Sequence, residues 1–182
     1  MKKLSVLILL LICVTLGAKA QLLEDMFHDK GHKVAVSLGP ELVFPSRSVY
    51  SIGYGASAKV EIPIKGNFNL TVTAGYSVFK YKSGLIGAFG PQEPAHFIPL
   101  KAGTRIALGT GFFFEGEVGN VFSTNKVNGA SSTQNFFTYS LGPAFLIKLS
   151  DKQNIDVGVR YESWSKSTMR QTAIRVAYRI GG

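Results

Sequence analysis

The sequence has little of what stabilises small exported proteins and little of what builds membrane helices. Its single cysteine, Cys13, lies in the first apolar run, so no disulfide can form in the rest of the chain. After residue 20, long apolar runs are few and no helical period of 3.6 residues is sustained. The chain also contains twenty glycines. Together these features favour an all-β protein over a disulfide scaffold or a helical membrane protein.

The first twenty residues predict a signal peptide. Lys2 and Lys3 precede the apolar run from Leu4 to Leu16, and residues 18–20 read Ala-Lys-Ala. This order of basic start, short apolar run and small-x-small cleavage site is typical of export signals. An uncleaved anchor is the alternative, although the run is too short for a membrane-spanning helix. Cleavage leaves residues 21–182, which suits one domain.

Residues 21–32 predict a short periplasmic segment before the main domain. Leu22, Leu23, Met26 and Phe27 could share one face of a short helix. His28 and His32 have a spacing that could ligate a metal, but two histidines without a third ligand are more often surface residues. We therefore expect no metal and no other cofactor.

The main domain is predicted to span residues 33–182, and its clearest feature is a strict alternation of apolar and polar residues. Between Asn67 and Val78 every even position is apolar and every odd position is polar or small, which indicates a strand with one apolar and one polar face. Twelve residues is close to what a tilted strand needs to cross a bilayer. Eight such segments are predicted, at residues 33–44, 50–62, 67–80, 96–107, 111–122, 136–148, 154–164 and 171–180.

The connections between these segments alternate in length. Tight turns are expected near Lys65-Gly66, Gly109-Thr110 and residues 150–152, whereas 81–95 and 123–135 form long loops on the other side. Short turns on one side and long loops on the other are typical of an antiparallel up-and-down transmembrane β-barrel in a bacterial outer membrane. In such a barrel both chain ends lie in the periplasm.

The charged residues of the strands all fall on the face opposite to the apolar one. A basic side chain that faced mid-bilayer lipid would cost about 2–4 kcal/mol, which explains why the apolar faces exclude charge. We therefore predict an interior of six acids and six bases: Glu41, Lys59, Glu61, Lys101, Arg105, Glu115, Glu117, Asp156, Arg160, Glu162, Arg175 and Arg179.

An eight-stranded barrel is just wide enough to be filled by its own side chains. Charges packed inside it must be paired, because an isolated buried ion costs several kcal/mol. The balanced interior predicts a plug of ion pairs and not an open pore. The alternative is a proton or ion path along the carboxylates.

Aromatic residues and prolines give two further expectations. Phe44, Tyr50, Phe79, Tyr81, Phe97, Phe122, Phe137 and Trp164 are expected to form an outer girdle on the loop side, with Phe68, Phe112, Phe145 and Tyr178 on the turn side. Strand preference for aromatic residues could explain part of this pattern.

Prolines at 40, 63, 99 and 143 interrupt the predicted strands, and the repeated Ser-Leu-Gly-Pro at 37–40 and 140–143 predicts two bulges.

In these patterns the chain resembles the small eight-stranded outer-membrane barrels, such as the membrane domain of outer membrane protein A and outer membrane protein X. The resemblance covers nearly the whole chain after residue 20 and rests on patterning without a diagnostic motif. It implies an outer-membrane location, periplasmic chaperones and the barrel assembly machinery as partners during biogenesis, and roles in envelope integrity, adhesion or host contact. Members of that family often end in an aromatic residue, whereas this chain ends Ile180-Gly181-Gly182.

The first functional hypothesis is a non-enzymatic, monomeric barrel whose loops contact lipopolysaccharide or partner molecules. The formal charge is +9, and loss of Lys2, Lys3 and Lys19 with the signal peptide leaves about +6. One acid, Glu93, stands on the loop side against six bases that could pair with lipid phosphates: Arg47, Lys80, Lys82, Lys126, Lys166 and Arg170. A merely solvated rim is the alternative reading of these bases.

Two other functions remain open, and a third is weaker. A lipid-modifying acyltransferase or deacylase would need a base beside a hydroxyl, for which His96 with Ser83 or Ser163 are the only candidates on that side. A secreted lipocalin-like carrier would need an apolar inside and a polar outside, the inverse of this charge pattern. Nucleic-acid binding is not expected, because the bases are divided between interior and rim.

Overall fold

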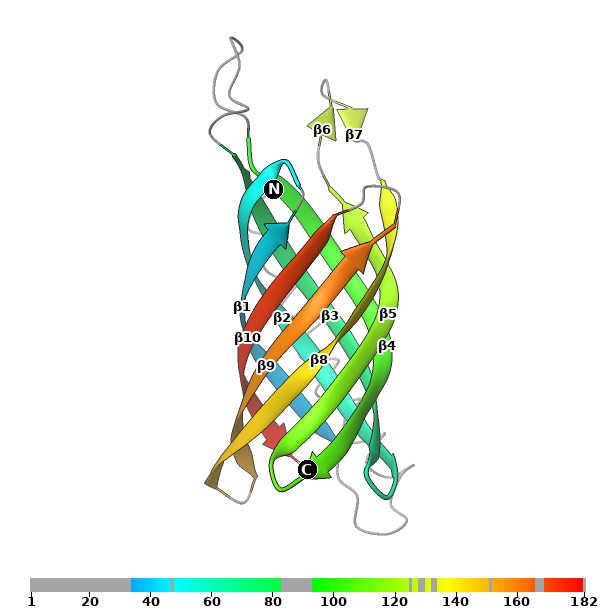
Figure 1. The fold of residues 1–182 in the computed structure, drawn as a ribbon, viewed down its shortest axis with the longest axis vertical. Helices are drawn as coiled ribbons and strands as arrows, with labels where there is room; N and C mark the ends of the chain where they lie inside the picture. The colour runs from blue at the N-terminus through cyan, green and yellow to red at the C-terminus, as the bar shows by residue number, and fades with distance from the viewer. Residues whose placement is uncertain are drawn as a thin grey trace, which may run out of the picture.

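A computed structural model describes residues 34–46, 48–82, 93–124, 126–127, 130–131, 134–150, 152–165 and 169–181 of the chain. Eight long strands form one closed barrel in which every neighbouring pair is antiparallel (Figure 1). They are β1 (Ala35–Ser46), β2 (Tyr50–Lys65), β3 (Phe68–Tyr81), β4 (Ala95–Gly109), β5 (Phe112–Ser123), β8 (Asn135–Ser150), β9 (Gln153–Trp164) and β10 (Arg170–Gly181). This is the predicted up-and-down order, closed where β10 pairs with β1.

The predicted segments and the observed strands agree except at their ends. The predicted signal peptide and the segment at residues 21–32 lie outside the described residues. One difference falls in the loop at 123–135, where the two-residue strands β6 (Lys126–Val127) and β7 (Ala130–Ser131) pair with each other above the barrel wall (Figure 1). Among the described residues there is no helix long and apolar enough to span a membrane.

The stagger of the strands sets the width of the barrel. Paired residues followed once around the wall from Ala35 return to β1 at Pro45, ten residues farther along. Such a stagger tilts strands from the barrel axis by about 35–45°, and the tilt is visible in Figure 1. The interior of an eight-stranded barrel of this kind is filled by side chains.

The turns and loops lie at opposite ends of the barrel, as predicted. Tight turns join β2 to β3, β4 to β5 and β8 to β9 at the bottom of Figure 1. Gly66 and Gly111 have φ angles of 59° and 76° in two of these turns, a left-handed conformation that favours glycine. The described chain also enters and leaves the barrel at this end, where Ala35 pairs with Gly181.

The bulges predicted at the two Ser-Leu-Gly-Pro sequences are absent, because the register of both strands is unchanged across them. Register shifts occur instead at Ser51 and just before each tight turn, at Ile64, Leu108 and Leu149. Of the four strand prolines, only Pro63 borders a bulge. An extra residue in one strand increases its local twist, which helps the strand to enter the turn.

The other three prolines interrupt one ladder each without shifting it. Pairing is missing between Pro40 and β10, between Pro99 and β3, and between Pro143 and β9, while pairing on the opposite side of each proline continues. Proline has no N–H to donate, so a strand that contains it loses a hydrogen bond on one side only. The wall therefore keeps its register but carries local gaps in its hydrogen bonding.

Candidate functional site

The burial of alternate residues shows which face of each strand points into the barrel and which points outward. Along β1 and β10 every inward position is buried and every outward position is exposed, down to near the strand ends. The outward positions carry exposed leucine, isoleucine, valine, phenylalanine and tyrosine on all eight strands. Buried positions carry most of the charged residues of the wall. The barrel is apolar outside and ionic inside.

The twelve charged residues predicted to face the interior come together in one unbranched chain of ion pairs. Eleven contacts within 4 Å join them, and acids alternate with bases throughout. The order is Glu115, Lys59, Glu117, Lys101, Glu162, Arg160, Glu41, Arg175, Asp156, Arg105, Glu61 and Arg179. Six acids and six bases cancel, so the interior carries no formal net charge from this set.

Two contacts in the chain have the paired geometry that makes arginine–carboxylate interactions strong. Arg105 donates from Nη1 and Nη2 to the two oxygens of Asp156 at 2.7 and 3.0 Å. Arg160 donates in the same way to Glu41 at 3.0 and 2.7 Å. The Arg105 guanidinium also lies 4.4 Å from the centre of the Phe113 ring. Bidentate pairing fixes orientation as well as energy, so these arginines hold the network in one arrangement.

Hydroxyl groups satisfy much of the remaining hydrogen-bonding capacity. Arg175 donates from Nε to Ser57 Oγ at 2.9 Å and from Nη2 to Ser37 Oγ at 2.9 Å. Thr73 donates to Glu117 Oε1 at 2.5 Å. Buried ion pairs offset their desolvation only when such additional bonds are present. The serine and threonine positions of the polar faces are therefore part of the ionic site, a role that sequence reasoning did not assign to them.

An apolar layer covers the ionic interior at the loop end, where an outer girdle was expected. Phe79, Phe97 and Trp164 are at most 5% exposed and pack against each other with ring centres 5.0–5.9 Å apart. Tyr50, Tyr81 and Phe136 pack against this cluster, which also contains Val43, Ala95, Val121, Met169 and Ala173. The prediction that Tyr50, Phe79, Tyr81, Phe97 and Trp164 face lipid was wrong.

The reason for this error is partly visible in the sequence. Phe79 and Phe97 have the same parity as the inward residues Thr73 and Lys101, and Trp164 has that of Glu162, so strict alternation already places them inside. Tyr50 differs, because the bulge at Ser51 turns it from the outer face to the inner one. Phe44, Phe137, Phe68, Phe145 and Tyr178 are exposed on the outer wall, as expected for girdle residues.

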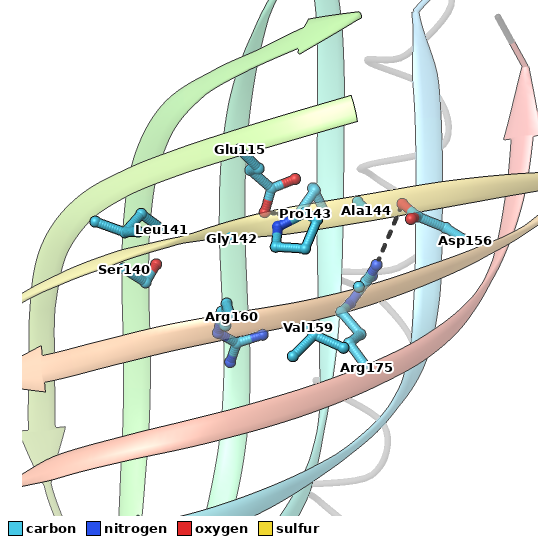
Figure 2. A pocket seen from close by; sticks show the side chains of 12 residues that line it. Glu115, Ser140, Leu141, Gly142, Pro143, Ala144, Asp156, Val159, Arg160 and Arg175 are labelled. Atoms are coloured by element: carbon cyan, nitrogen blue, oxygen red, sulfur yellow. Dashed lines mark hydrogen bonds and ion pairs between the residues drawn. The ribbon is translucent and has the colours of Figure 1, made fainter. Parts of the chain in front are cut away.

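A small cavity of about 20 Å³ lies where β8 and β9 are not paired (Figure 2). Lys59, Glu115, Asp156, Arg160 and Arg175 line its ionic side. A volume near 20 Å³ is enough for about one water molecule. Figure 2 shows the Arg175 and Asp156 side chains facing each other across this space.

The six predicted rim bases are not brought into one patch by the described residues. Lys80 lies on the outer face of β3, with Nζ 5.7 Å from the centre of the Tyr54 ring, and Lys82 follows the end of that strand. Arg170 begins β10, which β1 and β2 separate from β3. Arg47, Lys166 and the side chain of Lys126 lie outside the described part of the chain.

Of the residues considered for lipid-modifying chemistry, the two that the structure describes, His96 and Ser163, do not form a pair. His96 lies on β4, and its Nδ1 is 2.7 Å from the hydroxyl of Tyr76. Ser163 lies on β9, which β5 and β8 separate from β4. Ser83 lies outside the described residues. Within the described ranges, no three histidine, cysteine, aspartate or glutamate side chains are grouped so that they could hold a metal ion.

Neither family models nor curated proteins match this chain. Solved structures do. Neisserial surface protein A superimposes with a TM-score of 0.60 at 12% identity, over 83% of this chain and 97% of that one. Ail, the attachment invasion locus protein of Yersinia pestis, gives 0.57 at 12% identity, over 84% and 100%. Outer membrane protein OprG of Pseudomonas aeruginosa gives 0.54 at 10% identity, over 84% and 97%. The chain therefore has the fold of the small eight-stranded outer-membrane β-barrels.

Proposed function

We propose that this protein is an integral, non-enzymatic protein of the bacterial outer membrane whose barrel is closed to solutes and whose contacts are made by its outer wall and its loop end. The observation that carries the proposal is the inverted distribution of side chains, apolar outside and ion-paired inside. A water-soluble barrel such as a lipocalin-like carrier would need the opposite arrangement. Burying the apolar wall in lipid removes a large exposed hydrophobic surface from water.

Membrane fractionation together with a gel of unheated and boiled samples tests the location and the fold. A folded barrel should sit in the outer-membrane fraction and should migrate differently before and after boiling. Recovery of the folded protein from the soluble fraction, without detergent, would overturn the proposal.

The closed interior predicts that the protein does not conduct ions. The ion-pair chain fills the middle of the barrel, and the aromatic layer covers it at the loop end. Planar-bilayer recordings with the purified protein should show no stepwise conductance. Regular, reproducible steps would instead favour the alternative of an ion path along the carboxylates.

The end with the tight turns is proposed to face the periplasm, and the end with the long loops the outside. Outer-membrane barrels generally have short periplasmic turns and longer external loops. The chain has no cysteine after residue 20, so single cysteines can be introduced at Lys82 and at Lys65, which are exposed at opposite ends. In intact cells a membrane-impermeant maleimide should label Lys82→Cys and should not label Lys65→Cys. The reverse pattern would invert the orientation.

The loop-end bases are proposed to contact the phosphates of outer-leaflet lipid such as lipopolysaccharide. Lys80 and Lys82 lie at the end of β3, and the Lys80 ammonium lies over Tyr54, the arrangement of a basic and aromatic pair at a membrane interface. The triple variant Lys80→Ser, Lys82→Ser, Arg170→Ser should co-purify with less lipopolysaccharide. The matched control is Lys65→Ser, Lys152→Ser, which removes exposed bases at the turn end. Equal lipid content in all three proteins would remove this contact.

The non-enzymatic assignment has its own test. His96 is hydrogen-bonded to Tyr76, and the described serine candidate Ser163 lies on a strand that is not its neighbour. Overexpression should leave the lipid A profile unchanged by mass spectrometry. A shifted acylation pattern that is lost in His96→Ala would establish the lipid-modifying alternative.

The proposed partners during biogenesis are the periplasmic chaperones and the barrel assembly machinery, and the proposed state is a monomer without bound nucleic acid.

A further inference from the structure

The wall between β8 and β9 has a gap in its hydrogen bonding near the middle of both strands. Pairing stops after Leu141 with Tyr161 and resumes at Ala144 with Gly158. Pro143 has no N–H for β9 to accept, so the ladder cannot continue through this position. A Cβ on Gly142 would lie only 2.0 Å from the Val159 carbonyl oxygen, so only glycine fits there.

The cavity of about 20 Å³ lies at this gap and is lined from both sides of the wall (Figure 2). Leu141, Pro143 and Val159 are outward residues, whereas Arg160 and Arg175 belong to the ionic interior. The cavity therefore lies within the wall, between the lipid-facing surface and the ion-pair chain.

Two polar groups that line the cavity lack the direct contact they need. Glu115 Oε1 accepts from Lys59, but the buried Oε2 has no hydrogen-bond partner among the described residues. Arg175 Nη1 is 3.7 Å from Asp156 Oδ2, which is too long for a direct hydrogen bond. A polar contact longer than about 3.5 Å, in a cavity lined by charged side chains, is typical of a water-bridged site.

We propose that one buried water molecule binds in this cavity and bridges Glu115 Oε2 to Arg175 Nη1. The volume exceeds the roughly 10–15 Å³ that a water needs, and the lining supplies donors from Lys59 and Arg175 and acceptors from Glu115 and Asp156. Waters with two to four such partners are part of a folded structure and are costly to remove.

The water changes the connectivity of the ionic interior. Glu115 is one end of the chain of ion pairs, and Arg175 is its eighth member. A bridge between them closes that part of the chain into a ring, which ties β5 to β10 across the barrel. The ring also passes beside the gap between β8 and β9, one of the three places where a proline interrupts a ladder.

Gly158→Ala tests the site, because Gly158 lines the cavity and has room for a side chain. An added Cβ would have no neighbour closer than 3.8 Å, so it would occupy the space of the water without a clash. Gly116→Ala is the matched control, because Gly116 lies on the outer face and an added Cβ there has no neighbour closer than 4.0 Å. Replacing a strand glycine by alanine at an unstrained position stabilises a protein, since the unfolded chain loses freedom.

Urea unfolding in lipid vesicles should show changes in stability of opposite sign for the two variants, relative to the wild-type protein. Gly116→Ala should unfold at the wild-type urea concentration or above it. Gly158→Ala should unfold at a lower concentration, with the unfolding equilibrium constant raised about tenfold, because displaced water leaves Glu115 and Arg175 unsatisfied. Stabilisation of both variants to the same extent would overturn the proposal, because it would show a dry cavity.

A measurement on the unmodified protein keeps the proposal falsifiable if Gly158→Ala fails to fold. Magnetisation transfer from water to the Gly158 Hα protons should be seen by NMR in bilayers with perdeuterated lipid, although Gly158 lies far from either end of its strand. Ser140 also lines the cavity, so the transfer must persist in Ser140→Ala, which removes relay through a hydroxyl proton. Absence of transfer in both proteins would overturn the site.

Discussion

The indole Nε1 of Trp164 donates a 2.6 Å hydrogen bond to Oε1 of Glu162, two residues earlier on the same strand. Both side chains point into the barrel, so this bond joins the aromatic layer to the chain of ion pairs. Glu162 also accepts from Lys101 at 2.8 Å and from Gln171 at 2.7 Å. The two parts of the interior are thus one hydrogen-bonded structure, with Glu162 at the junction.

The inward position of Trp164 predicts how its fluorescence responds to lipid. Trp164 is the only tryptophan in the chain, so the emission of the folded protein reports the loop-end layer. Brominated acyl chains should quench it weakly, because the wall separates the indole from lipid. Reconstitution in vesicles with and without brominated lipid gives the measurement.

The double variant Phe137→Trp, Trp164→Phe is the control for this measurement. Phe137 precedes Thr138, which pairs with Trp164, and Phe137 is exposed on the outer wall. The tryptophan at position 137 of the double variant would therefore lie at the same height as Trp164 but on the lipid-facing side of the wall, and it should be quenched strongly. If the wild-type protein were quenched as strongly as the double variant, Trp164 would belong to an outer girdle after all.

Alternation along the sequence was enough to predict the barrel because it records a single physical constraint. Lipid excludes charge from the middle of the outer face of every strand, so residues such as Arg105 and Asp156 could be assigned inward without knowledge of their partners. Their partners could not be predicted, because pairing across the barrel depends on stagger and on side-chain conformation. The bidentate Arg105–Asp156 pair joins β4 to β9, which are not neighbours in the wall.

The features that sequence reasoning misplaced have local causes. Tyr50 faces inward because one extra residue, Ser51, interrupts the alternation, and no pattern in the sequence marks that bulge. Pro40 and Pro143 were expected to bend their strands, but the missing N–H of each faces one neighbour only, so the register survives. The positions of Phe79, Phe97 and Trp164 could have been predicted from parity alone, had alternation been followed to the ends of the strands.

The ion-pair chain predicts that replacing one member of a buried ion pair destabilises the barrel more than replacing both members of that pair. Arg105 is fully buried and joins Asp156 to Glu61, so Arg105→Met leaves a buried carboxylate without its bidentate partner. Loss of one member of a buried pair costs about 3–5 kcal/mol. The double variant Arg105→Met, Asp156→Asn should be closer to wild type than Arg105→Met alone.

Guanidinium unfolding followed by Trp164 fluorescence measures these differences. Arg179→Met is a suitable comparison, because Arg179 is the last member of the ion-pair chain and, among the described residues, has one ion pair, at 3.3 Å to Glu61. It should cost clearly less than Arg105→Met. Simple additivity of Arg105→Met and Asp156→Asn would contradict the network, because it would show that the two residues stabilise the barrel independently.

The outer wall predicts that an added charge costs most at the middle of a strand. Leu100 lies near the centre of β4 and Leu108 near its turn end, and both are exposed on the outer face. In a bilayer, arginine costs about 2–4 kcal/mol at the midplane and about 0–1 kcal/mol near the interface, so Leu100→Arg should be much less stable than Leu108→Arg. Alanine at each position corrects for the lost leucine, and refolding into vesicles with urea titration gives the free energies of unfolding. If this wall faced water, both arginines would be tolerated equally, so a depth-independent result would contradict a membrane-spanning barrel.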